Sequence, residues 1–104
     1  MNKKRDDFTD KTKQILARRV NDFCSNPNCR QQTSGPHSDP GKSTIIGEAA
    51  HITAAEEGGP RYNPDLTAEK RKSPENGIWL CASCADLIDK DEERYTVELL
   101  KEWK

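Results

Sequence analysis

The sequence predicts a small α+β domain that is held together by a bound metal ion, and three observations lead to this prediction. Apolar residues make up 32% of the chain and charged residues 34%, which is a thin supply for a hydrophobic core. Four cysteines within 104 residues can provide an additional staple. Short apolar segments typical of strands alternate with segments of helical periodicity. One domain is therefore expected over residues 1–104.

Three segments have a helical pattern, and each follows a threonine that can act as an N-cap. Thr9 precedes a helix expected over residues 9–21, Thr67 a short helix through Arg71, and Thr96 a last amphipathic helix. That last helix reaches Lys104 without a terminating Gly or Pro, which indicates a piece of a longer chain or a helix that docks on a partner. The apolar stripe of the first helix comprises Phe8, Ile15, Leu16, Val20 and Phe23.

Two segments are expected to be strands, and a third to be a loop. Residues 44–52 begin with Thr-Ile-Ile and should run as one strand to His51 and Ile52. Residues 78–80 (Ile-Trp-Leu) should form a second strand, followed by a helix that begins near Ala85. Residues 31–43 are polar and rich in Gly and Pro, which predicts a mobile loop.

The chain shows no sign of secretion or membrane insertion. Its first residues are charged rather than apolar, and no apolar stretch approaches the roughly 20 residues of a membrane span. We therefore expect a cytoplasmic protein without membrane contact, in a compartment where disulfides are disfavoured.

The cysteines form two pairs, Cys24 with Cys29 and Cys81 with Cys84. Both spacings are typical of zinc knuckles, in which one turn presents two sulfur atoms to the ion. The four thiolates are expected to hold one structural Zn²⁺, which would tie the N-terminal segment to the second half of the chain. Two disulfides, or thiols that do not interact, are the alternatives.

The overall charge does not indicate a nucleic-acid-binding protein. The formal net charge is −1, so any contact with nucleic acid must come from local basic patches. Such patches are more often ordinary solvated faces. The candidates are Lys3, Lys4 and Arg5; Lys11, Lys13, Arg18 and Arg19; and Lys70, Arg71 and Lys72.

Three segments of the chain carry a resemblance to a known family. They are Glu48-Ala-Ala-His-Ile, Gly58-Gly-Pro-Arg-Tyr, and Asn76-Gly-Ile-Trp-Leu-Cys-Ala-Ser-Cys-Ala-Asp-Leu-Ile-Asp. With the two cysteine pairs, they resemble the HNH (ββα-metal) endonucleases over roughly residues 24–89. In detail the chain is similar to the nuclease modules of bacterial antiphage effectors. The resemblance implies a small ββα-metal domain with flanking helices, stapled by the four-cysteine zinc site.

The resemblance also implies a function, the hydrolysis of DNA phosphodiester bonds with weak sequence selectivity. His51 would be the general base that deprotonates the attacking water, a role suited to imidazole because its ordinary pKa lies near neutrality. Asn76 would orient the loop and His51, or give an oxygen to a catalytic Mg²⁺ or another divalent ion. The partner would be double-stranded DNA, with a regulatory domain or a second copy of the chain activating cleavage.

Two positions depart from the family pattern. Ala50 and Ala85 stand where the family usually has metal ligands, and alanine can ligate nothing. Glu48, on the same strand face as Ala50, and Asp89, one helical turn beyond Ala85, can substitute as ligands of the catalytic ion. The alternatives are an inactivating substitution introduced at Ala85, a natural inactive relative, and ordinary surface roles for both carboxylates.

The remaining predicted contacts are with DNA. Arg61 follows a Gly-Gly-Pro turn and could hold a phosphate through two hydrogen bonds, the alternative being a structural pair with a carboxylate. Arg71 and Lys72 are further candidates for phosphate contact. The rival function is a catalytically inactive, zinc-stabilised module that binds DNA or another protein.

Overall fold

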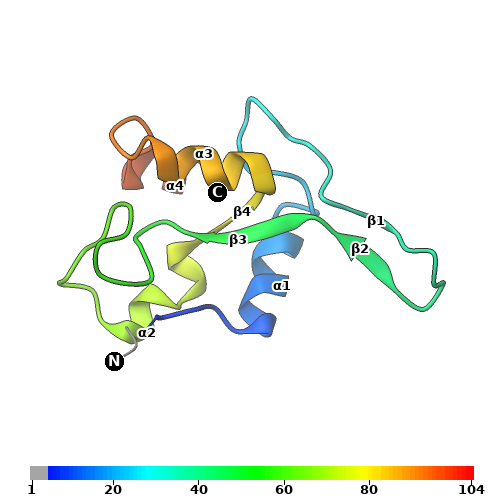
Figure 1. The fold of residues 1–104 in the computed structure, drawn as a ribbon, viewed down its shortest axis with the longest axis horizontal. Coiled ribbons are helices and arrows are strands. Elements are labelled where there is room, and N and C mark those ends of the chain that lie inside the picture. The colour runs from blue at the N-terminus through cyan, green and yellow to red at the C-terminus, as the bar shows by residue number, and fades with distance from the viewer. Residues whose placement is uncertain (1–4) are drawn as a thin grey trace.

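The computed structural model describes residues 5–104, so Lys3 and Lys4 of the first predicted basic patch lie outside the described residues. Within this range the fold is α+β, with two small antiparallel sheets and helices around them (Figure 1). The elements are α1 (Asp10–Arg19), β1 (Ser34–Pro36), β2 (Ser43–Ile45), β3 (Gly47–His51), α2 (Ala68–Arg71), the 3₁₀ turn η1 (Pro74–Asn76), β4 (Gly77–Cys81), α3 (Ala82–Lys90) and α4 (Val97–Trp103).

Helix α1 begins where the sequence predicts it. The hydroxyl of Thr9 accepts a hydrogen bond from the amide of Thr12 at 3.2 Å, which satisfies one of the free donors of the first turn. The expected apolar stripe is only partly buried. Leu16 is 2% exposed, whereas Ile15 and Phe23 are 40% and 37% exposed. The prediction for Phe23 was wrong because the helix ends at Arg19 and the chain turns before Phe23 is reached.

Residues 31–43 do not form the predicted mobile loop, because much of this segment belongs to a hairpin. Strands β1 and β2 pair antiparallel, with Ser34 opposite Ile45 and Pro36 opposite Ser43. At the tip, the carboxylate of Asp39 accepts a hydrogen bond from the amide of Gly41 at 2.9 Å. The Gly and Pro residues therefore serve a tight reversal of the chain. The hairpin projects from the rest of the molecule (Figure 1).

The second sheet is the centre of the fold. The strand predicted over residues 44–52 is interrupted at Ile46, so that β2 and β3 belong to different sheets. Strand β3 pairs antiparallel with β4, and His51 lies opposite Gly77. The sheet lies between α1 and α3 (Figure 1). The chain order β3, β4, α3 therefore places a helix directly after an antiparallel pair.

Strand β4 is buried on both faces, and its side chains alternate between two small cores. Ile78 and Leu80 pack with Ile88 of α3 and Leu100 of α4. Trp79 packs on the opposite face with Leu16 of α1. Since each core is small, neither helix layer buries much apolar area, which agrees with the low apolar content of the chain.

Helix α3 begins at Ala82, three residues earlier than predicted. The cause is Cys81, whose sulfur accepts a hydrogen bond from the amide of Cys84 at 3.4 Å and caps the helix. The helix therefore starts within the second cysteine pair rather than after it.

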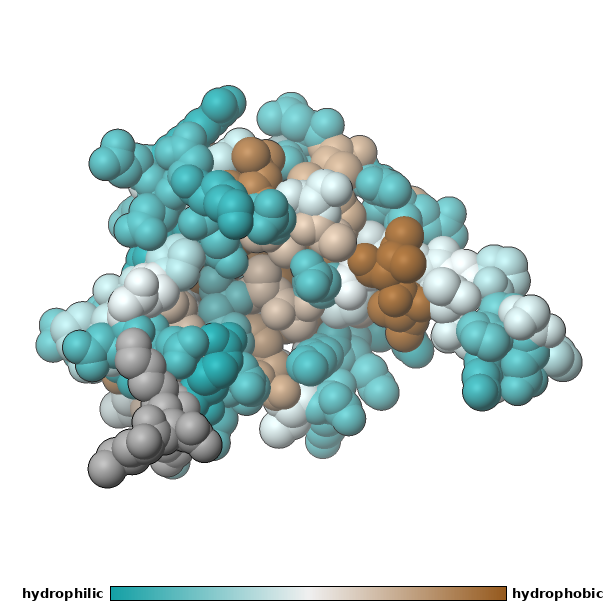
Figure 2. Space-filling model, viewed as in Figure 1, coloured by the Kyte–Doolittle hydropathy of each residue, from teal (hydrophilic) through white to brown (hydrophobic). Residues whose placement is uncertain are grey.

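The surface is mostly hydrophilic, with a compact hydrophobic patch where β2 leads into β3 (Figure 2). Ile45 and Ile46 occupy this junction and are 62% and 53% exposed. No helix within residues 5–104 has the length and apolar content needed to cross a membrane.

Candidate functional site

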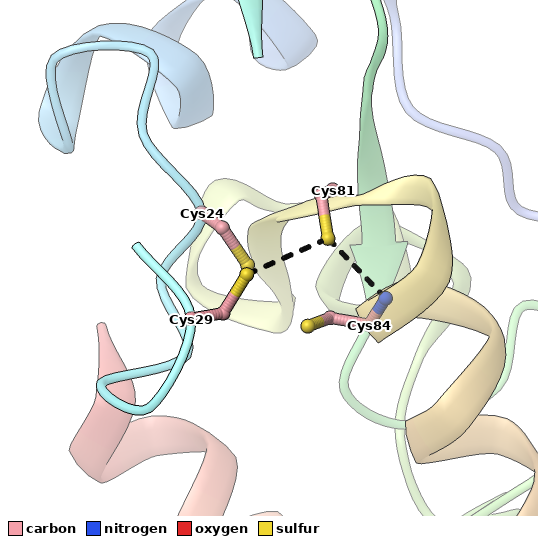
Figure 3. A group of neighbouring side chains, drawn as sticks. All are labelled: Cys24, Cys29, Cys81 and Cys84. Carbon is pink, nitrogen blue, oxygen red and sulfur yellow. Dashed lines mark hydrogen bonds between the residues drawn. The ribbon is translucent and has the colours of Figure 1, made fainter. Parts of the chain in front are cut away.

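The two cysteine pairs converge on one point. Cys24 and Cys29 come from the loop after α1, and Cys81 and Cys84 from the junction of β4 with α3 (Figure 3). All four sulfur atoms lie within 4.8 Å of one another, an arrangement that could hold a metal ion. The four cysteines are free, so the alternative of two disulfides does not describe this structure.

The spacing of the sulfur atoms fits one tetrahedral ion. With bonds of about 2.3 Å from zinc to sulfur, tetrahedral geometry separates neighbouring sulfur atoms by about 3.8 Å. The sulfur atoms of Cys29 and Cys81 are 3.9 Å apart. The amide nitrogen of the Asn26 side chain donates to the sulfur of Cys84 at 3.5 Å, a contact that stabilises negative charge on that sulfur.

Without a metal, burial disfavours ionisation of two of the four thiols. Burial raises the pKa of the Cys24 and Cys84 thiols. A divalent cation reverses this preference because it binds thiolates rather than thiols. Metal binding therefore releases protons, and the ion offsets part of the negative charge that four thiolates would otherwise carry.

A second candidate site is a cleft of about 330 Å³ that is lined by β3, the loop after it and α3. This cleft brings together His51 and the two carboxylates that the sequence assigned to the catalytic ion, whereas Asn76 lines a different cavity. Its lining includes Glu48, Ala50, His51, Ala85 and Asp89. Ala50 and Ala85 thus face the same space as the two carboxylates proposed to replace them.

The His51 imidazole is held in one orientation. Its Nε2 atom lies 2.8 Å from the backbone carbonyl oxygen of Asp6. Since a carbonyl only accepts hydrogen bonds, Nε2 carries the proton and Nδ1 carries the free lone pair. The ring also stacks on Phe8, with 3.9 Å between ring centroids and 8° between planes. Burial lowers the pKa of His51, which favours the neutral imidazole that a general base requires.

Asn76 orients the loop that follows β3. Its Oδ1 accepts hydrogen bonds from the amide and the hydroxyl of Thr53, at 2.9 Å and 2.8 Å. Its Nδ2 donates to the carbonyl oxygens of Thr53 and Arg71, both at 2.9 Å. The side chain is buried, and its oxygen is already shared by two donors. Of the two expected roles, the geometry favours orientation of the loop over ligation of a metal.

Arg61 is turned inward, which corrects the expectation that it holds a phosphate. Its Nε and Nη1 donate to the carbonyl oxygens of Ile52 and Ile88, each at 2.7 Å. Its Nη2 contacts Oδ1 of Asp89 at 2.9 Å, and the arginine side chain is 5% exposed. Each guanidinium nitrogen therefore has a protein partner. The structural arginine–carboxylate alternative describes this residue, and its carboxylate is Asp89 itself.

Arg71 is also withdrawn from the surface, contrary to its expected contact with DNA. Its Nη1 lies 3.4 Å from Oδ2 of Asp6, and the two side chains are 13% and 8% exposed. Its guanidinium also covers the ring of Tyr62 at 4.8 Å from the centroid. Lys72, the next residue, is exposed, so it remains available as a surface contact.

Four residues of the cleft and its surroundings were not assigned to this site from the sequence, although Arg5 was named as a possible nucleic-acid contact. Arg5 and Glu56 line the cleft and are joined by a contact of 2.7 Å. Asp6 and Phe8 contact the His51 ring and fix its orientation. Asp6 acts through its backbone carbonyl, for which no residue type is diagnostic, and Phe8 was assigned to the helical stripe. No sequence signal identifies either contact.

Comparison with known proteins adds no assignment. No protein-family model matches the chain, and no curated protein matches it significantly.

Proposed function

We propose that this protein is a metal-dependent endonuclease of the HNH type that hydrolyses phosphodiester bonds in DNA. The observation that carries the proposal is the fixed His51 imidazole, with its Nε2 proton on the Asp6 carbonyl, in a cleft that also contains Glu48 and Asp89. The succession of β3, β4 and α3 and the four-cysteine cluster are the architectural support for the family.

In the proposed reaction, the unprotonated Nδ1 atom of His51 is the base. Its Nδ1 accepts a proton from a water molecule as the water oxygen forms a bond to phosphorus. The bond from phosphorus to the leaving sugar oxygen breaks, and solvent returns a proton to that oxygen. Asn76 keeps the chain after β3 in place through Thr53, so it acts as a positioning residue.

The cleft has a donor set suited to a divalent cation. Its lining contains three carboxylates, those of Glu48, Glu56 and Asp89, and the guanidinium group of Arg5. A positive ion would therefore reduce the repulsion among the carboxylates. Magnesium prefers oxygen ligands and keeps several waters, so one or two carboxylates with substrate phosphate suffice. Glu48 and Asp89 would hold the ion, which would stabilise charge on the phosphate.

The four cysteines have a separate task in this proposal. They would bind one structural Zn²⁺, which joins the loop after α1 to the start of α3. With sulfur at all four positions, the ion has no open site for a substrate or water. Catalysis would therefore depend on the second, oxygen-rich site.

Contacts with DNA would come from exposed cations outside the cleft. A groove of about 720 Å³ between α1 and the hairpin also borders Glu48, and Lys13 and Arg18 line it. Lys72 lies exposed after α2. Such residues contact phosphates rather than base edges, which supports weak sequence selectivity.

A plasmid-nicking assay with the zinc-loaded protein tests this proposal. Mg²⁺, Mn²⁺ or Ni²⁺ should convert supercoiled plasmid to the nicked form, and EDTA should stop the reaction. Intact plasmid with all three ions at high protein concentration would count against the nuclease.

A second candidate is favoured by the two alanines in the cleft. Because Ala50 and Ala85 line it, the positions that the family uses for ligands offer none, and Arg61 occupies one oxygen of Asp89. In this case the protein is an inactive, zinc-stabilised module that binds DNA or another protein. Calorimetry with Mn²⁺ separates the two, because only the nuclease should bind this ion after its zinc site is saturated.

A further inference from the structure

The segment formed by residues 5–8 lies against the His51 ring, and its residue Arg5 lines the same cleft. In Figure 1 this blue segment runs from beside α2 to the start of α1. It has no regular secondary structure, yet Asp6 and Phe8 are both buried, at 6% exposure each. A short extended segment loses conformational entropy when it is fixed in this way, so its contacts must offset that cost.

Two contacts of this segment act directly on the His51 ring. The Asp6 carbonyl oxygen accepts the Nε2 hydrogen bond, and the Phe8 ring stacks on the imidazole face. The first contact selects the tautomer, and the second limits rotation of the ring. Together they determine where the Nδ1 lone pair lies.

Three further contacts hold the segment in place. The Asp6 amide donates to the carbonyl of Ala55 at 3.1 Å, and the Asp6 carboxylate pairs with Arg71 at 3.4 Å. Arg5 contacts Glu56 at 2.7 Å. The ion pair of Asp6 with Arg71 is the buried one, so removal of Arg71 would leave an uncompensated carboxylate.

Strand β4 provides the space that this arrangement needs. Gly77 lies opposite His51 in the sheet. A Cβ atom at this position would meet the side chains of Leu16 and Phe8, the latter at 3.0 Å. The absence of a side chain at Gly77 is therefore what allows Phe8 to approach the sheet beside His51.

We propose that residues 5–8 form a positioning strap for His51, anchored by Arg71, and that the site can perform base catalysis only while this strap is docked. The inference rests on the proposed nuclease function and extends it to residues without contact to the substrate. Asp6, Phe8 and Arg71 are positioning residues. Arg71, predicted from the sequence as a DNA contact, acts instead through Asp6.

Charged groups near the His51 ring affect its protonation, so a test of the strap must leave them unchanged. They are Arg5, Asp6 and Asp7 on the strap, Glu48 on β3, Glu56 on the following loop, and Asp89 on α3. A suitable change therefore loosens the strap without altering any of these groups.

The substitution Phe8→Leu meets this condition, because it changes no charged group. Arg71→Met tests the anchor itself and also leaves the Asp6 carboxylate without its partner. Arg94→Met is the matched control for Arg71→Met, because Arg94 also covers a tyrosine ring, at 5.6 Å, but is exposed and lies far along the chain. NMR of histidine labelled with ¹⁵N reports the strap directly, since the chain has two histidines. The wild type should show an Nε2 proton of His51 protected from exchange and nuclear Overhauser effects between the His51 and Phe8 rings.

Arg71→Met should lose the protected proton and lower kcat by about tenfold with KM unchanged, because a displaced base is poorly aligned with its water. Arg94→Met should change neither. If Arg71→Met does not fold, Phe8→Leu, which keeps the apolar volume, should show the same loss of the proton and of kcat. The strap is refuted if the proton is unprotected in the wild type, or if the folded variants retain both signal and kcat. Because the NMR signature needs no substrate, it decides the strap even where the plasmid assay detects no cleavage.

Discussion

The Nε2 atom of His51 lies 2.8 Å from the carbonyl oxygen of Asp6, 45 residues earlier in the chain. This contact assigns the proton to Nε2 and leaves Nδ1 as the acceptor. It also joins the end of β3 to the segment that precedes α1. The proposed general base at the end of β3 is thereby supported from a part of the chain that has no regular structure.

The pH dependence of cleavage should reflect the environment of His51. Burial lowers its pKa, so the neutral base should persist below the ordinary histidine value of about 6.5. The acidic limb of kcat/KM should therefore have its midpoint below about 6.5. Replacement of the exposed His37 by Gln should leave this limb in place. A midpoint above the ordinary value would contradict the assignment.

The lowered pKa of His51 also makes the stability of the folded protein depend on pH. Because the folded protein resists protonation of His51 more than the unfolded chain does, the free energy of unfolding should decrease as pH falls below about 6.5. Urea unfolding of the wild type and of His51→Gln over this range measures the effect. The variant should lose part of the pH dependence, and identical slopes would exclude His51 as its source.

Removal of the metal from the cysteine cluster should unfold the protein. Structural zinc supplies about 10–16 kcal/mol in small domains, and a typical domain is stable by only about 5–15 kcal/mol. Elemental analysis should find one zinc per chain, and a strong chelator should abolish the tertiary circular-dichroism signal until zinc is restored. A zinc-free protein with an unchanged signal would show that the cores suffice without the ion.

Asn76→Ala should destabilise the fold substantially. The substitution leaves the amide and carbonyl of Thr53 and the carbonyl of Arg71 without their partner. Since a buried unsatisfied group costs about 1–3 kcal/mol, the loss should be about 3 kcal/mol or more. Urea denaturation measures it, with the exposed Asn28→Ala as a control expected to change by less than about 0.5 kcal/mol. If the free energy of unfolding falls no more than in the control, Asn76 does not orient the loop.

Asp89→Ala should reduce metal-dependent cleavage by about tenfold or more while the zinc content stays at one per chain. Asp89→Ala removes the carboxylate partner of the buried Arg61, but Asp89 is half-exposed and Arg61 keeps the carbonyl oxygens of Ile52 and Ile88, so the variant should remain folded with some loss of stability. Asp86→Ala, on the same helix and paired with Lys90 at the surface, is the matched control. Equal activity in the two variants would remove Asp89 from the site.

The sequence predicted features that depend on local chemistry. The threonine caps of three helices, strand β4 and the paired cysteines each have a short signal, and each lies as expected. The hairpin was missed because its Gly and Pro residues are equally typical of a loop, and β2 and β3 were merged because Ile46 gives no sign of a break.

The site was harder to predict where it depends on the path of the backbone. The sequence placed His51 beside Glu48 and Asp89, and these residues share the cleft. It could not predict the direction of Arg61 or Arg71, because both arginines satisfy carbonyl groups and carboxylates that only the folded chain brings near. Glu56 and the strap were missed for the same reason.

The central claim is that His51 is the base of a metal-dependent nuclease, and the direct measurement is the rate of plasmid nicking with Mn²⁺ for the wild type, His51→Ala and His37→Ala. The account predicts nicking by the wild type and His37→Ala and a loss of at least about a hundredfold for His51→Ala, within the range that general bases contribute. All three proteins should contain one zinc per chain. Equal nicking by His51→Ala and the wild type would contradict the account.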